Sequence, residues 1–194
     1  METWILPALL GVGLAAATGF RTFLPLLMLG LAARFQLFGI EISGAMSWLD
    51  SDPALIALAL ATVFELAADK IPFVDHVLSL IGTVARPVAG AVAAGAAFVT
   101  LDPLVAAIAG LIIGAPTAMA FHSAQAGTRV LSSASTGGLG NPLVSFIEDL
   151  TAFIMVIVAF LAPVLIPVVL VVVLLALWRL WRAVRRPRPA IQDG

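Results

Sequence analysis

Six apolar segments, separated by short polar or Pro-containing stretches, constrain how this chain can fold. A helix needs about 20 apolar residues to cross the hydrocarbon core of a bilayer, and the segments are close to that length or longer. They span residues 4–33, 53–70, 84–101, 103–122, 143–162 and 163–182. Hydrophobic residues make up 62% of the chain and charged residues 11%, unlike a soluble domain. The sequence therefore predicts an all-α polytopic membrane protein with about six transmembrane helices, in which residues 1–183 form a single transmembrane domain.

Lys and Arg residues gather on one predicted side of the membrane. The segments on that side carry Lys70, Arg86, Arg129 and the basic tail at residues 184–194. The loops on the other side combine Arg34 with four acidic residues: Glu41, Asp50, Asp52 and Asp102. Since Lys and Arg are enriched in cytoplasmic loops, this distribution predicts a cytoplasmic tail and, with six spans, both termini in the cytoplasm.

Composition and motifs argue against several classes of function. The net charge of -1 and the lack of a basic stripe with interleaved aromatic residues argue against nucleic-acid binding. The chain has no Cys, which excludes disulfides and thiolate chemistry. Its two histidines, His76 and His122, lack the spacing of metal ligands, and there is no nucleophile elbow, zinc signature or phosphate loop. We therefore expect no metal, no cofactor and no enzymatic activity.

The first apolar segment, 4–33, is long enough to be interrupted. Pro25 follows Arg21 and Thr22, and a proline removes a backbone donor and clashes with the preceding turn of a helix. The sequence therefore predicts a break in this segment near Arg21.

A short motif recurs in the two halves of the chain. Residues 13–22 and 114–123 each run from a Gly through an apolar stretch into a Phe, a cationic side chain and a hydroxyl. These trios are Phe20, Arg21 and Thr22 in the first copy and Phe121, His122 and Ser123 in the second. If three helices separate the copies, the second is inverted relative to the first, as in many secondary transporters. The pattern predicts two inverted three-helix repeats, 4–101 and 103–182; chance similarity between two Ala- and Gly-rich helices is the alternative.

Ionisable residues near the bilayer centre cost about 2.5–3.5 kcal/mol each, so each one is a candidate for function. Glu65 and Asp69 lie four residues apart, which places both carboxylates on one helix face, where they could share a proton or bind a cation. Lys70 follows directly. In the alternative interpretation the segment is a salt-bridged helix end from which Lys70 reaches the cytoplasmic surface.

Glu148 and Asp149 form a second acidic pair. Asn141 and Pro142 predict the start of a helix with Asn141 as its cap, and this start puts both acids in the second turn. Two adjacent acids in a membrane helix need a partner. That partner could be a bound cation, a proton or one of three arginines: Arg21, Arg86 and Arg129.

Two connecting segments carry further polar residues. Residues 125–140 contain Arg129 and are rich in Gly and hydroxyl-bearing residues, which is typical of a mobile connector or of a gate or anion-binding loop. Residues 73–83 have apolar residues at helical spacing, which predicts a short amphipathic helix at the inner membrane surface or a re-entrant piece. Asp75 and His76 would then lie near that surface.

Three motifs carry a family resemblance. They are Thr18-Gly19-Phe20-Arg21-Thr22, Glu65-Leu66-Ala67-Ala68-Asp69-Lys70-Ile71-Pro72 and Ser135-Thr136-Gly137-Gly138-Leu139-Gly140-Asn141-Pro142. With them the chain resembles, over most of residues 5–165, the domain of unknown function 4126 family of small bacterial integral membrane proteins. The resemblance implies a location in the bacterial inner membrane and brings no established activity. The acid-plus-base segments are also similar to the Glu-x-Gly-Asp-Lys motifs of inverted-repeat cation/proton exchangers, although Glu65 and Asp69 are one residue further apart than in that motif.

These features together predict a small secondary transporter driven by protons or a cation. Its expected partners are the lipid bilayer and a small solute or ion, and its Gly- and Ala-rich faces are compatible with a homodimer. In this hypothesis Glu65 and Glu148 couple transport to the driving ion, while Arg21 and His122 face the substrate path. Thr22, Asp69, Ser123 and Asp149 complete the pathway, and Lys70, Asp75, His76, Arg129 and Asn141 belong to the gate or loop. Two alternatives stay open: a membrane enzyme or scramblase acting on lipid headgroups, and a non-catalytic scaffold in which the charges form internal salt bridges.

Overall fold

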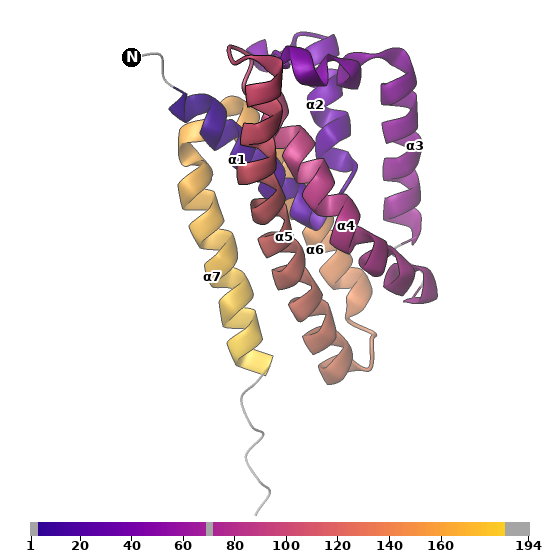
Figure 1. Cartoon of the computed structure of the whole chain (residues 1–194). Helices are drawn as coiled ribbons and strands as arrows, with labels where there is room; N and C mark the ends of the chain where they lie inside the picture. The colour runs from indigo at the N-terminus through magenta and orange to yellow at the C-terminus, as the bar shows by residue number, and fades with distance from the viewer. Residues whose placement is uncertain (1–3, 69–71, 185–194) are drawn as a thin grey trace, which may run out of the picture.

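The computed structural model describes residues 4–68 and 72–184, except for the side chains of residues 72–78, 180, 183 and 184 (Figure 1). The described residues are helical throughout, with short connections and no strand. In chain order the helices are α1 (Ile5–Phe20), α2 (Leu24–Arg34), η1 (Leu37–Gly39), η2 (Gly44–Asp50), α3 (Asp52–Ala68), α4 (Pro72–Ala96), α5 (Pro103–Thr136), α6 (Asn141–Leu161), η3 (Pro163–Leu165) and α7 (Ile166–Val184). The predicted all-α class is confirmed.

The outer surfaces of the helices are apolar. Leu60 and Phe64 of α3, Leu111 of α5 and Val172 of α7 are all exposed, and a contiguous apolar surface of this kind marks a membrane-facing or interaction surface. Among the described residues, α4, α5 and α6 are long and apolar enough to cross a membrane, and the bent pair η2 and α3 is a fourth candidate. A lipid bilayer is therefore the environment that this surface fits.

Helices α1 and α2 form a hairpin that enters and leaves the bundle at the same end. Gly13 of α1 packs against the last turn of α6, whereas Arg21 contacts the first turns of α6. After α2, the ring of Phe38 lies 6.1 Å from that of Phe160, so the chain has returned to its starting level (Figure 1). The predicted break near Arg21 is confirmed. The prediction that residues 4–33 form one span is wrong, because the chain reverses direction at the break.

This reversal changes the positions of the two ends of the described chain. Figure 1 shows the start of α1 at the top of the bundle and the end of α7 at the bottom. The prediction that both termini lie on one side does not fit this arrangement, because the hairpin adds one change of direction to the chain.

The two copies of the short motif lie side by side and run in the same direction. Gly11 of α1 and Gly114 of α5 both pack against Ala94 of α4. Further along the same two helices, the rings of Phe20 and Phe121 meet with their centroids 5.6 Å apart. The second copy is therefore not inverted relative to the first, contrary to our prediction. The reason is that residues 4–33 reverse direction at the break instead of crossing once, which adds one reversal between the two copies.

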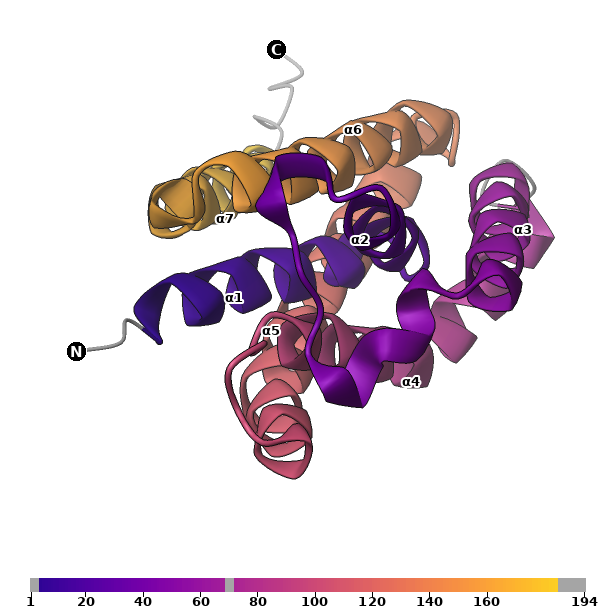
Figure 2. The same ribbon diagram turned by 90° about the horizontal axis from the view of Figure 1, so that it is seen from above.

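Helix α1 lies at the centre of the bundle. Figure 2 shows it between α4 and α5 on one side and α6 and α7 on the other, and it contacts all four. Its buried face consists largely of small residues, including Gly11 and Gly13, which allow close approach of helices in lipid. Helices α4 and α5 pack in the same way, since a Cβ on Gly114 would overlap the carbonyl oxygen of Gly90. The Gly- and Ala-rich faces that we considered compatible with a homodimer thus pack against other helices of the same chain.

Two segments predicted as connectors or separate elements belong to long helices. Helix α5 continues to Thr136, so most of residues 125–140 is helical, and the turn begins at Gly137, which has a φ of 61°. Hydroxyls in this stretch bond to carbonyls one turn earlier, as in Thr136 to Ser132 at 2.7 Å, so a polar sequence remains helical. Residues 73–83 likewise form the first turns of α4, which turn outward from the rest of the helix (Figure 1).

Candidate functional site

The break between α1 and α2 leaves backbone donors inside the bundle. Arg21 has an extended backbone that ends α1, and Pro25 lies in the first turn of α2. The first amides of a helix have no acceptor within it. Here the N–H of Thr22 donates to Oε1 of Glu65 at 2.8 Å, and that of Phe23 donates to Oε2 at 3.2 Å. Glu65 therefore closes the start of α2.

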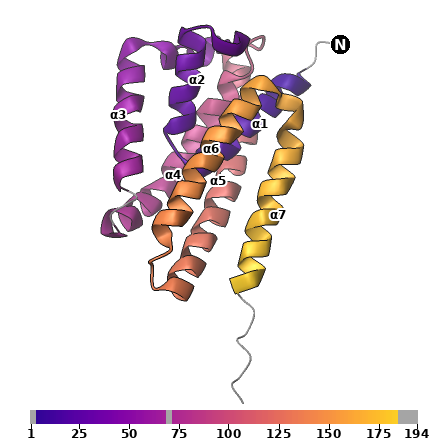
Figure 3. The same ribbon diagram turned by 180° about the vertical axis from the view of Figure 1, so that it is seen from behind.

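Glu65 belongs to α3, a helix at the edge of the bundle (Figure 2, Figure 3). Helix α3 packs mainly on α2 and η2. Its outer face carries exposed apolar side chains such as Phe64, whereas Thr62 and Glu65 on the inner face are each 5% exposed. The contact between Glu65 and the start of α2 thus attaches the second half of α3 to the bundle.

Arg21 is completely buried and directed toward α6. Its Nη2 donates to the carbonyl oxygen and the hydroxyl of Ser145, at 3.2 and 3.0 Å. Its Nε forms an ion pair with Asp149, and Nη2 lies 4.0 Å from Glu148. The guanidinium therefore joins the hairpin break to the acidic pair predicted on α6.

Glu148 of α6 accepts hydrogen bonds from two residues of α5. Its Oε2 accepts from Nε2 of Gln125 at 2.7 Å and from Nη2 of Arg129 at 2.6 Å. The Nε of Arg129 lies 3.1 and 3.3 Å from the two carboxylate oxygens. Of the partners considered from sequence, Arg21 and Arg129 contact the acidic pair directly, and Arg129 lies on a helix rather than in a loop.

Arg86 of α4 joins this network through its Nη1. That atom donates to the carbonyl oxygen of Gly19 at 2.9 Å and to Oε1 of Gln125, and lies 2.8 Å from Nδ1 of His122. Arg86 is 6% exposed, yet its Nε has no hydrogen-bond partner among the described residues. A Cβ on Gly82, one turn earlier in α4, would lie 3.2 Å from Nε. Because Gly82 has no side chain, Nε faces open space.

This space is part of a cavity of about 50 Å³ inside the bundle. Besides Gly82, its walls include the start of α2 and five polar side chains: Glu65, Arg86, His122, Gln125 and Arg129. A cavity of this size holds a few water molecules or a small ion. Polar groups from four helices thus face one space within an apolar bundle.

The charges of the network balance. It contains three arginines (Arg21, Arg86 and Arg129) and three acids (Glu65, Glu148 and Asp149). Balanced and hydrogen-bonded charges are the form in which ionised groups persist away from water. On the cavity wall itself, however, two arginines face one carboxylate.

A second cavity lies beyond Glu148, between α5, α6 and α7. Its volume is about 180 Å³, and its walls are mainly apolar, with Phe20 on one side and Val173 and Leu177 on another. Arg129 lines the first cavity and Glu148 lines the second, so the ion pair between them stands between the two spaces.

The other residues predicted for the site lie outside this network or outside the described residues. Ser123 faces away from it and donates to the carbonyl oxygen of Met119 at 2.8 Å. Asn141 does not cap α6; its Nδ2 donates to Ser133 at 2.9 Å, because the turn brings it onto the end of α5. Asp69 and Lys70 lie outside the described residues, and Asp75 and His76 lie in the first turns of α4, where only the backbone is described.

Sequence analysis did not single out Gln125 or Ser145, although both hold charged members of the network. Their side chains are uncharged, so the cost of burying charge gave no signal for them. One signal was available: His122, Gln125 and Arg129 lie at i, i+3 and i+7, on one face of α5.

The chain matches the family model described as domain of unknown function DUF4126 over residues 8–183, and it belongs to that family. No curated protein and no solved structure matches it.

Proposed function

We propose that this member of the DUF4126 family is a small secondary transporter of the bacterial inner membrane, coupled to protons or a cation through Glu65 and Glu148. The observation that carries the proposal is a connected set of buried ionisable side chains at a helix break, beside a cavity, inside an apolar bundle. Intramembrane charges mark ion pathways and proton relays. Broken helices whose termini face a central site are a recurring feature of transporters.

The path in this proposal runs through the two cavities. Glu65, Arg86 and His122 face the solute in the first cavity, and the Arg129–Glu148 ion pair is the barrier to the second. Neutralising Glu148 by a proton releases Arg129 and joins the two spaces. Arg21, which is completely buried, holds the broken helix on α6.

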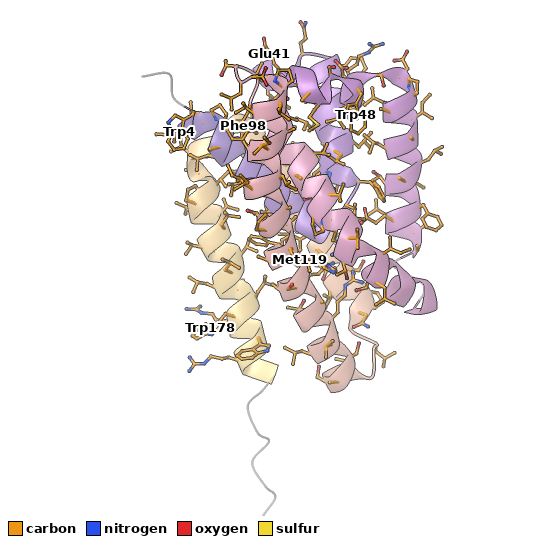
Figure 4. All side chains as sticks on the ribbon, viewed as in Figure 1. Trp4, Glu41, Trp48, Phe98, Met119 and Trp178 are labelled. Carbon is orange, nitrogen blue, oxygen red and sulfur yellow. The ribbon has the colours of Figure 1, made fainter. Side chains whose placement is uncertain are left out.

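The proposed orientation places the end of α7 in the cytoplasm. Arg179 and Arg182 lie in the last turns of α7, whereas Arg34 and most of the exposed acids lie at the other end of the bundle. Trp4 and Trp48 lie toward that other end and Trp178 toward the cytoplasmic end (Figure 4), as aromatic residues do at the two interfaces of a membrane. In this orientation α3 to α7 cross the bilayer, and the α1–α2 hairpin enters it from outside.

Flux measurements in proteoliposomes test the proposal. Vesicles with an interior pH dye are challenged with cations, anions and small metabolites, using wild type, the Glu65→Gln/Glu148→Gln double variant and a Glu41→Gln control. Glu41 is exposed and remote from the network. A solute-dependent proton signal that survives in the control and disappears in the double variant supports the proposal, and equal signals in all three contradict it.

A lipid-handling function is the second candidate. It is favoured by a largely apolar groove of about 300 Å³ between α5 and α7, lined by Leu174, Trp178 and Trp181, with Ser123 in its wall. Such a groove fits an acyl chain. This candidate predicts flipping or turnover of labelled lipid without any ion gradient, in the same vesicles.

A further inference from the structure

The start of α2 is an anion site that the chain itself fills. Helix α2 has 11 residues, and the N-terminus of a helix attracts negative charge through its free amides and its dipole. The amides of Phe23, the N-cap of α2, and of Thr22, the residue before it, hold the carboxylate of Glu65, one oxygen each. A carboxylate on a different helix therefore occupies the position that a bound oxyanion would take.

The second observation is independent of α2. Arg86 is 94% buried, since only 6% of it is exposed, and its Nε has no hydrogen-bond partner among the described residues. A buried polar group without a partner is costly, about 1–3 kcal/mol and more when charged. Gly82 leaves the space in front of Nε open, and both residues line the same cavity as Glu65. The unused donor thus points to a ligand with an acceptor oxygen.

The cavity wall favours an anion of small size. Arg129 is already paired with Glu148, and the α2 amides bind the carboxylate of Glu65. The guanidinium of Arg86 is hydrogen-bonded to uncharged groups among the described residues, so its positive charge is the one that an anion in the cavity would meet. A volume of about 50 Å³ fits one carboxylate group with a short substituent.

We infer that the solute is a small monovalent oxyanion, such as a short-chain carboxylate, which replaces the Glu65 carboxylate at the start of α2 and accepts a hydrogen bond from Nε of Arg86. The inference rests on the proposed transport function and names the substrate class of the same site.

Replacement of Glu65 accounts for coupling to protons. Glu65 faces the α2 amides, Arg86 of α4, and His122 and Arg129 of α5. Its carboxylate must leave the amides when the solute anion arrives, and one proton on Glu65 keeps the total charge of the cavity unchanged. One anion then moves together with one proton, so the transport cycle carries no net charge.

Binding of probe anions to the purified full chain in detergent tests the inference without requiring transport. Formate and acetate are titrated at constant ionic strength and followed by saturation-transfer NMR, with methylammonium as the cationic probe. Gly82→Ala places a Cβ in front of Nε and should weaken formate binding about fivefold, the value of one lost hydrogen bond. Gly127→Ala is the matched control, because a Cβ there meets no atom within 4 Å.

Glu65→Gln replaces the internal carboxylate that competes with formate by an uncharged amide. Because a neutral acceptor binds the α2 amides more weakly than a carboxylate does, formate binding should tighten about tenfold. This gain cannot come from misfolding, so it complements the loss expected for Gly82→Ala. The inference is overturned if neither wild type nor Glu65→Gln binds formate or acetate, or if Gly82→Ala and Gly127→Ala bind them equally. Cation-driven flux without anion binding would refute the inference and leave the transporter proposal standing; anion binding without any flux would refute transport and retain the site.

Discussion

The carboxylate of Glu65 accepts the backbone N–H of Thr22 at 2.8 Å, so α3, at the edge of the bundle, satisfies a backbone donor at the break between α1 and α2. Lipid offers no hydrogen bonds to an interrupted helix, and each unsatisfied backbone group there costs several kcal/mol. The break after α1 and the buried acid on α3 therefore depend on each other. This pair connects the reversal of the chain with the cavity proposed as the transport site.

Removing the Glu65 side chain should destabilise the fold. Glu65→Ala leaves one buried and one partly buried amide without acceptors, which costs about 2–3 kcal/mol of unfolding free energy, whereas Glu65→Gln retains one acceptor and should cost about half as much. Unfolding in mixed detergent micelles, followed by far-UV circular dichroism, measures both. Equal stability of Glu65→Ala and the exposed control Glu41→Ala would contradict the capping role.

The buried and exposed ion pairs should differ sharply in their contributions. Arg21→Met removes a completely buried cation and leaves Asp149, whose side chain is 22% exposed, opposite an apolar side chain; it should cost about 3 kcal/mol. Arg34→Met breaks a pair with Asp52 whose side chains are 48% and 73% exposed, and should cost about 1 kcal/mol or less. The double variant Arg21→Met/Asp149→Leu should recover much of the loss. The same unfolding assay measures these differences, and a double variant no more stable than Arg21→Met would argue against charge burial as the cause.

Packing of α4 against α5 should be sensitive to one methyl group. Gly114→Ala places a Cβ against the carbonyl oxygen of Gly90 and should cost about 1–3 kcal/mol, as overpacking does. Gly127→Ala on the same helix meets open space and should be neutral or stabilising by up to about 1 kcal/mol. Thermal unfolding in detergent separates the two, and similar melting temperatures would show that α4 and α5 are not in backbone contact.

The hairpin should be detectable by cysteine labelling, since the chain contains no native Cys. We expect Trp4→Cys and Gln36→Cys, at the two ends of the hairpin, to react with a membrane-impermeant maleimide in intact cells. Ser135→Cys, at the far end of α5, should react only after permeabilisation. If Trp4→Cys and Gln36→Cys were labelled from opposite sides of the membrane, residues 4–33 would form a single span and the hairpin would be contradicted.

Local signals predicted the break at Arg21 but not the direction of the chain after it. Pro25 acts on its own helix turn, so the interruption is visible in the sequence. The reversal depends on contacts between distant residues, such as Phe38 with Phe160, which no local pattern contains. The opposite orientation predicted for the two motif copies was not found for the same reason, because that prediction assumed one direction for residues 4–33.

The charged members of the site were predictable, and their arrangement was not. Glu65 and Glu148 stand out because burying charge in an apolar segment is costly. Which charge meets which was not predictable, since Glu65 binds backbone amides instead of a cationic side chain. Residues 125–140 were mistaken for a loop because composition does not reveal that helical hydroxyls can bond within the helix.

In the proposed mechanism Glu65 couples solute movement to proton movement. The most direct test imposes a formate gradient on proteoliposomes with an interior pH dye and compares wild type, Glu65→Gln and Glu41→Gln at equal protein content. We expect formate-driven acidification of the vesicle interior in wild type and Glu41→Gln, above that of protein-free vesicles, and none above that background in Glu65→Gln. Acidification at an equal rate in Glu65→Gln would show that Glu65 does not couple formate to protons.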